Sequence, residues 1–135
     1  MADLSITAAS VMAAAGATTS NVTAGATITA GQLVYLDTAD SEYKLVDNDA
    51  AGTATVAGIS LNGASDGQPL SILVAGNIDV GATLTQGEVY CASSTAGGIA
   101  PDADNVTGDF RSVLGVATTT SNLLVSIINS GVAIP

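Results

Sequence analysis

Few residues of this chain could carry out chemistry. Its 135 residues include no His, one Cys (Cys91), two basic side chains (Lys44 and Arg111) and twelve carboxylates. Without His, the chain cannot build a Ser-His-Asp or Cys-His catalytic group. A reactive thiolate at Cys91 would need a neighbouring cation, and only Lys44 or Arg111 could supply one. We therefore interpret Cys91 as a buried, inert thiol and expect a protein that is not an enzyme.

Two acidic clusters could bind a cation. They are Asp47-Asn48-Asp49 and Asp102-Ala103-Asp104-Asn105, and they occupy similar places in two related parts of the chain. Closely spaced oxygen ligands can hold Ca²⁺, but the EF-hand pattern with its Gly and distal Glu is absent. Asp and Asn are also common in solvated turns, which is the interpretation we favour. One Cys and no His cannot supply the usual zinc ligands, so we expect no metal and no cofactor.

The charge balance limits the partners. The formal net charge is -10, which argues against nucleic acid because phosphate binding needs several Lys or Arg contacts. Charged residues make up 10% of the chain, against roughly a quarter in typical soluble domains. A surface so poor in charge is often covered by a partner. No continuous apolar run is long enough to span a membrane, and Met1–Ala17 lacks the basic start of a signal peptide, so we expect a soluble protein made in the cytoplasm.

The chain contains an internal repeat. The segment Gly25–Gly31 (GATITAG) returns as Gly81–Gly87 (GATLTQG), and a strand-like run with a Tyr follows each copy, at Tyr35 and Tyr90. The repeat defines two halves, at about residues 25–76 and 81–131. Two copies are too few for a solenoid and suit one closed body made of two related halves.

Both halves have β character. Val, Ile, Leu, Thr and Tyr cluster in short runs bounded by Gly, Asn, Asp and Ser, and no stretch has helical periodicity. Residues 33–36 and 43–46 form a predicted hairpin, and Asn62-Gly63 and Asp66-Gly67 predict turns that need a positive φ. We therefore expect an all-β fold, a small barrel or sandwich of two related halves. Residues 1–24 lie outside the repeat and form either an extended arm or an extra first strand beside the β domain of residues 25–135.

Several stretches resemble a known family, the capsid cement or head decoration proteins of tailed bacteriophages. The resemblance covers nearly the whole chain and depends on the order of Gly-, Thr- and apolar-rich motifs. Its clearest stretches are Ala2–Ala9, Ala24–Asp37, Gly58–Leu73, Gly81–Tyr90 and Thr95–Asp104. It implies a β-rich virion protein that binds the outside of the expanded capsid and bridges major capsid protein subunits. It also implies a homo-oligomer, usually a trimer and sometimes a dimer, made in the host cytoplasm.

We expect the N-terminal segment to supply part of the contact with the capsid or with other subunits. This segment lies outside the repeat, and it is apolar and uncharged around the four residues that we expect to make the contact. The residues concerned are Leu4, Ile6, Val11 and Met12. The alternative function is a secreted or cell-surface adhesion module that binds glycans. That alternative predicts calcium dependence through Asp47, Asp49, Asp102 and Asp104, although four aromatic residues and no Trp offer little surface for a sugar.

Overall fold

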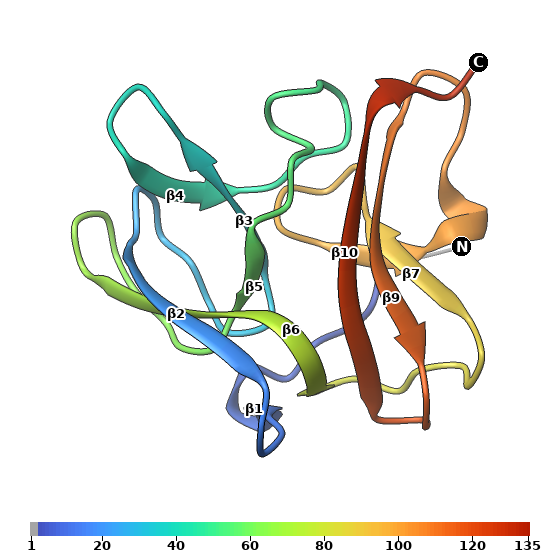
Figure 1. Cartoon of the computed structure of the whole chain (residues 1–135), viewed down its shortest axis with the longest axis horizontal. Helices are drawn as coiled ribbons and strands as arrows, with labels where there is room; N and C mark the ends of the chain where they lie inside the picture. The colour runs from blue at the N-terminus through green and yellow to red at the C-terminus, as the bar shows by residue number, and fades with distance from the viewer. Residues whose placement is uncertain (1–2) are drawn as a thin grey trace.

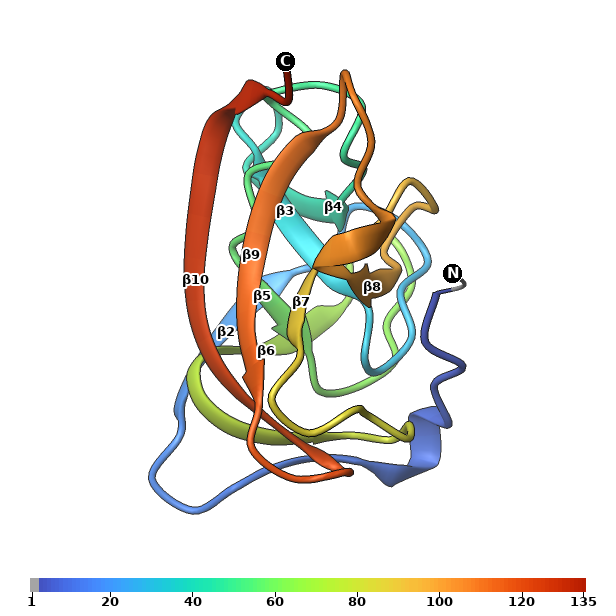
Figure 2. The same cartoon turned by 90° about the vertical axis from the view of Figure 1, so that its right-hand side faces the viewer.

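The structure, a computed structural model, describes residues 3–135 and is almost entirely β. Its strands form one antiparallel ten-stranded sheet that curls into a half-barrel (Figures 1 and 2). The all-β prediction is confirmed, and the described helical elements are the short 3-10 turns η1 (Ala8–Ser10) and η2 (Asp102–Asp104). The strands are β1 (Val11–Ala13), β2 (Thr18–Thr23), β3 (Leu33–Asp37), β4 (Glu42–Leu45), β5 (Gly58–Ser60), β6 (Pro69–Val80), β7 (Val89–Ala92), β8 (Ile99–Pro101), β9 (Phe110–Ala117) and β10 (Asn122–Ala133).

The two halves of the sheet have the same order of strands when each is followed from its outer end toward the middle. From one end to the other the order is β4-β3-β5-β6-β10-β9-β7-β8, so the two halves meet where β6 pairs with β10. Each half has a hairpin (β3–β4 or β7–β8), a middle strand (β5 or β9) and a strand of 12 residues. A duplicated unit would produce this order, while the duplication itself stays a prediction.

Two glycines hold equivalent positions in these halves. A Cβ added at Gly58 of β5 would lie 2.7 Å from the carbonyl oxygen of Leu73 in β6. A Cβ at Gly115 of β9 would overlap the carbonyl oxygen of Leu124 in β10. Only a residue without a Cβ allows the neighbouring backbone to come so close.

The N-terminal segment belongs to the sheet, as the extra-strand alternative predicts. Both β1 and β2 pair with β6, and Val22 of β2 lies opposite Leu70. Ahead of these strands, the backbone N–H of Leu4 donates to the carbonyl of Ile99, and that of Thr7 donates to the carbonyl of Gly81, both at 2.8 Å. From residue 3 onward, the segment is therefore bound along the rest of the chain.

The core lies on the concave side of the curled sheet and joins both halves. The larger apolar cluster includes Leu33, Ile59 and Leu73 from the first half and Leu114 and Leu123 from the second, all fully buried. A smaller cluster around Ile28, Leu70 and Ile72 fills the end near β2 and the β3–β4 hairpin. Each such side chain contributes about 1.5–3 kcal/mol through burial, so the halves stabilise each other.

The predicted turns are partly confirmed. The β3–β4 hairpin forms. Its loop, Thr38–Ser41, is shorter than the stretch of residues 37–42 between the two predicted strands. Gly67 has the expected positive φ of 86°, but Gly63 is absent from the positive-φ residues. Asn62 instead orders this turn through its side chain, whose Oδ1 accepts from the N–H of Ser71 at 2.7 Å.

Candidate functional site

The thiol of Cys91 lies in β7, buried in the protein. Burial raises its pKa to about 12, and a hydrogen bond from Sγ to Oδ1 of Asp102 at 3.4 Å acts in the same direction. Because the thiolate is the nucleophilic form, a thiol held protonated in this way is unreactive. The position of Cys91 thus agrees with the inert thiol inferred from the sequence.

Both basic side chains are used in ion pairs. Nζ of Lys44 lies 2.7 Å from Oδ2 of Asp37 and 3.0 Å from Oδ2 of Asp40, at the turn end of the β3–β4 hairpin. These hydrogen bonds with Lys44 lower the pKa of both carboxyl groups. Nε of Arg111 lies 2.7 Å from Oδ1 of Asp102. These cations therefore hold local structure, and Asp102 stands between Arg111 and the Cys91 thiol as a shared partner.

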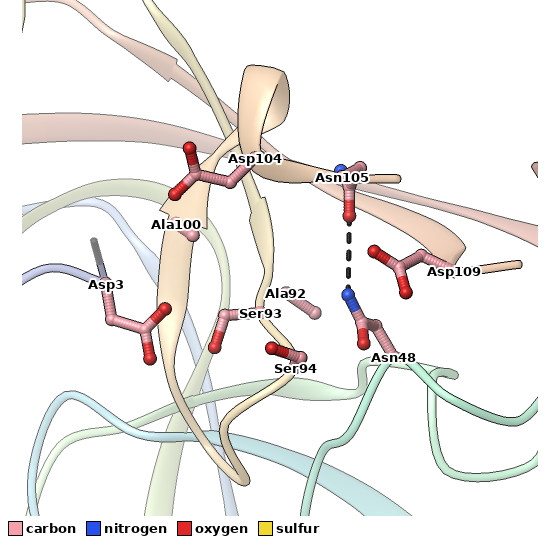
Figure 3. Close-up of a pocket in the computed structure, with 9 residues that line it drawn as sticks. All are labelled: Asp3, Asn48, Ala92, Ser93, Ser94, Ala100, Asp104, Asn105 and Asp109. Atoms are coloured by element: carbon pink, nitrogen blue, oxygen red, sulfur yellow. Dashed lines mark hydrogen bonds between the residues drawn. The ribbon is translucent and has the colours of Figure 1, made fainter. Parts of the chain in front are cut away.

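The structure brings the two predicted acidic loops together. Nδ2 of Asn48 donates to Oδ1 of Asn105 at 3.4 Å (Figure 3). The backbone N–H of Phe110 donates to the carbonyl of Asn48 at 2.7 Å. A pocket of about 100 Å³ lies at this junction. Its polar lining comes from Asp3, Asn48, Ser93, Ser94, Asp104, Asn105 and Asp109.

This pocket has no ready metal centre. Within residues 3–135, no three Asp, Glu or Cys side chains form a group that could hold a metal ion. Two of the carboxylates named for calcium have local roles: Oδ1 of Asp47 accepts from the N–H of Asp49, and Asp102 pairs with Arg111. The most unusual atom is Oδ1 of Asn48, which is buried without a hydrogen-bond partner. The pocket is also too small for the ligands of typical small-molecule sites, which fill about 300–1,000 Å³.

A larger candidate site is the outward face of β9 and β10, which we call the β9–β10 face and define as Val113, Val116, Leu124, Ile128 and Val132. Leu124 lies opposite Val116, and Ile128 lies opposite Val113, so four of these side chains form adjacent cross-strand pairs. Ile128 is 63% exposed and Val132 is 66% exposed. The chain has no charged side chain after Arg111, so the face is poor in charge, although Arg111 lines a hollow with Ser130 and Val132 at one end of it.

The predicted contact residues divide into two groups. Leu4, Ile6 and Val11 are only partly exposed and pack against the main core, so their apolar character serves folding. Met12 is 69% exposed on β1 and remains a possible contact. The β9–β10 face was not predicted from the sequence, although the absence of charged side chains from Ser112 to Pro135 was a visible signal of it.

Comparison with known proteins assigns no function, so a functional proposal must use the structural features described above. No protein-family model matches the chain, and no curated protein matches it. No helix in residues 3–135 is long and apolar enough to span a membrane. The structure is that of an all-β protein with exposed apolar side chains on β9 and β10, and exposed apolar patches are typical of surfaces that contact other proteins.

Proposed function

We propose that this protein is a structural subunit of a tailed-bacteriophage head. It binds the outer surface of the expanded icosahedral capsid and stabilises the shell by bridging neighbouring major capsid protein subunits. The observation that carries the proposal is the exposed, apolar β9–β10 face, because exposed apolar patches mark sites of protein contact. The major capsid protein is proposed as the partner because the sequence resembles capsid cement proteins.

Stabilisation of a shell by such a protein is additive. Each contact removes apolar surface from water, at about 25 cal/mol per Å², and several contacts made by one oligomer act together. A homo-oligomer, with a trimer favoured, would engage several capsid subunits at once. A bridging oligomer needs a contact between its own copies and another with the shell. The β9–β10 face is our candidate for the contact with the shell, and Met12 of β1, which lies outside that face, is a second candidate.

Co-sedimentation with capsids tests this proposal. The purified protein is mixed with expanded capsids of its source phage from which bound outer proteins have been removed, with and without EDTA. We expect saturable binding at a fixed ratio to the major capsid protein, unchanged by EDTA and weakened by Ile128→Asp and by Met12→Asp. The matched control is Val106→Asp, since Val106 is also an exposed apolar residue outside the β9–β10 face. Absence of binding to intact expanded shells would refute the proposal, and binding lost in EDTA would favour the calcium-dependent alternative.

A further inference from the structure

The pocket at the junction of the two acidic loops, which we call the polar pocket, contains a buried acceptor that lacks a donor. Asn48 is only 2% exposed, and its Oδ1 has no hydrogen-bond partner within residues 3–135. In Figure 3, the amide oxygen of Asn48 turns away from Asn105 and toward the part of the pocket where Ser94 lies. Because an unpaired buried polar atom destabilises a fold, this oxygen indicates that a hydrogen-bond donor binds here.

Neighbouring hydrogen bonds fix which end of the Asn48 amide faces the pocket. Nε of Arg111 lies 2.7 Å from Oδ1 of Asp102, and Nδ2 of Asn105 donates to the same oxygen at 3.4 Å. A carboxylate can only accept hydrogen bonds, so a reversed Asn105 amide would lose this bond. Oδ1 of Asn105 therefore faces Asn48, whose Nδ2 donates to it at 3.4 Å. Turning the Asn48 amide over would break this chain of bonds, so its oxygen needs a donor from outside.

The charges around the pocket favour a positively charged donor. Asp3 and Asp109 line the pocket, and neither forms an ion pair within residues 3–135. Lys44 and Arg111 are the only basic side chains of the sequence, and both pair with carboxylates outside the lining. A hollow walled by carboxylates concentrates a negative potential. The pocket should therefore attract a cation that also carries hydrogen-bond donors.

A primary ammonium group matches this set of acceptors. It has three donors and no acceptor, and the pocket presents acceptors from three separate segments, at Asp3, Asn48 and Asp109. Ca²⁺ needs about six to eight oxygen ligands, and no three acidic or Cys side chains of residues 3–135 form a metal-binding group. A guanidinium group prefers the two oxygens of a single carboxylate.

The size of the pocket also suits such a group. A cavity needs about 10–15 Å³ to hold one water molecule, which is similar in size to an ammonium group. The pocket has about 100 Å³, which leaves room for the methylene groups next to the nitrogen.

We propose that the polar pocket binds a primary ammonium group through Oδ1 of Asn48 and the carboxylates of Asp3 and Asp109. A free alkylamine or a lysine side chain of another protein carries this group. The site lies outside the β9–β10 face, and the inference does not rest on the proposed role in the capsid.

The test is an NMR titration of the isotope-labelled protein with n-butylammonium. The side-chain amide signal of Asn48 and the backbone signals of Asp3 and Asp109 should shift and saturate at millimolar concentration. Butyltrimethylammonium has the same charge but no N–H donor, so it should leave these signals unchanged. Nα-acetyl-lysine amide is the third probe, because it presents the ammonium group as a lysine side chain does.

Variants that remove one charge locate the site. Asp109→Asn should raise the dissociation constant of butylammonium about tenfold or more, as expected for loss of a charge-assisted hydrogen bond. Its amide oxygen can still accept from the N–H of Val106, as Oδ2 of Asp109 does at 2.9 Å. Asp3→Asn, on a different segment, should act in the same direction. The matched control is Asp66→Asn, which removes the same charge from an exposed turn outside the pocket and should change the constant less than about twofold.

Circular dichroism and the thermal midpoint establish that each variant is folded. Signals of the pocket that stay unchanged with butylammonium would overturn the inference, since water alone would then fill the pocket. Equal binding of butyltrimethylammonium would also overturn it, as would an Asp66→Asn effect as large as that of Asp109→Asn. Binding of both butylammonium and Nα-acetyl-lysine amide would support a lysine source, and binding of butylammonium alone would support a free amine.

Discussion

The closest backbone approach in the subunit makes a quantitative prediction for Gly115→Ala. A Cβ at position 115 would overlap the carbonyl oxygen of Leu124, so β9 and β10 must separate around this point. Gly115 lies opposite Val125, and the next pair is Leu124 with Val116. Loss of two backbone hydrogen bonds costs about 2 kcal/mol, and overpacking adds about 1–3 kcal/mol. The free energy of unfolding should therefore fall by about 3–5 kcal/mol, from a total that is typically 5–15 kcal/mol.

Urea unfolding followed by circular dichroism measures this loss. With a slope of about 2 kcal/mol per molar urea, the midpoint of Gly115→Ala should fall by about 2 M. The matched control is Gly52→Ala, because a Cβ at Gly52 meets no atom within 4 Å, and its stability should change by less than about 0.5 kcal/mol. Gly58→Ala, in the equivalent position of the first half, should cost about 1–3 kcal/mol. Equal midpoints for Gly115→Ala and Gly52→Ala would refute the close approach of β9 and β10.

Three further predictions concern the titratable groups. Cys91, whose pKa is raised from 9.0 to about 12, should react with thiol reagents about a thousandfold more slowly than a free thiol, and rapid labelling of the folded protein would contradict its burial. Its contribution to the free energy of unfolding should be lost as the pH rises from about 9 to 12. Lys44→Met should raise the pKa of Asp37 and Asp40, as measured by an NMR titration. In the wild type, carboxyl groups with a lowered pKa stabilise the fold above the ordinary carboxyl pKa and lose this effect in acid, so the variant should lose less stability at acid pH. An unchanged titration would show that the ion pairs do not form in solution. Added calcium should leave the thermal midpoint unchanged, and a rise that Asp109→Asn abolishes would instead reveal a cation site in the polar pocket.

The fold class was predictable because local residue patterns determine it. Runs of β-branched residues between Gly-rich turns predicted an all-β fold, and Asp66-Gly67 predicted a positive φ at Gly67. A strand in residues 1–24 was predicted only as one of two alternatives, since Thr18–Thr23 of β2 is largely polar and exposed and takes its strand form from pairing with β6. The extension of β6 past residue 76 to Val80, where it pairs with β10 of the other half, was also missed, because pairing between distant segments leaves no local pattern.

The contact surface was harder to predict than the fold. Leu4, Ile6 and Val11 have the side chains expected of a contact, yet packing against the core takes most of their surface. In β10, Leu123 is buried and Leu124 is exposed, although the residue type is the same. Which of two adjacent leucines faces solvent depends on the register with β6 and β9, which is fixed only when the strands pair.

The stability of the capsid itself tests the central claim most directly. Expanded capsids stripped of outer proteins are heated with and without a saturating amount of this protein, and shell opening is followed by light scattering and by release of packaged DNA. If the protein bridges major capsid protein subunits, it should raise the temperature of shell opening in proportion to the sites filled, and Met12→Asp should reduce this increase. Capsids that open at the same temperature with every site filled would contradict the account.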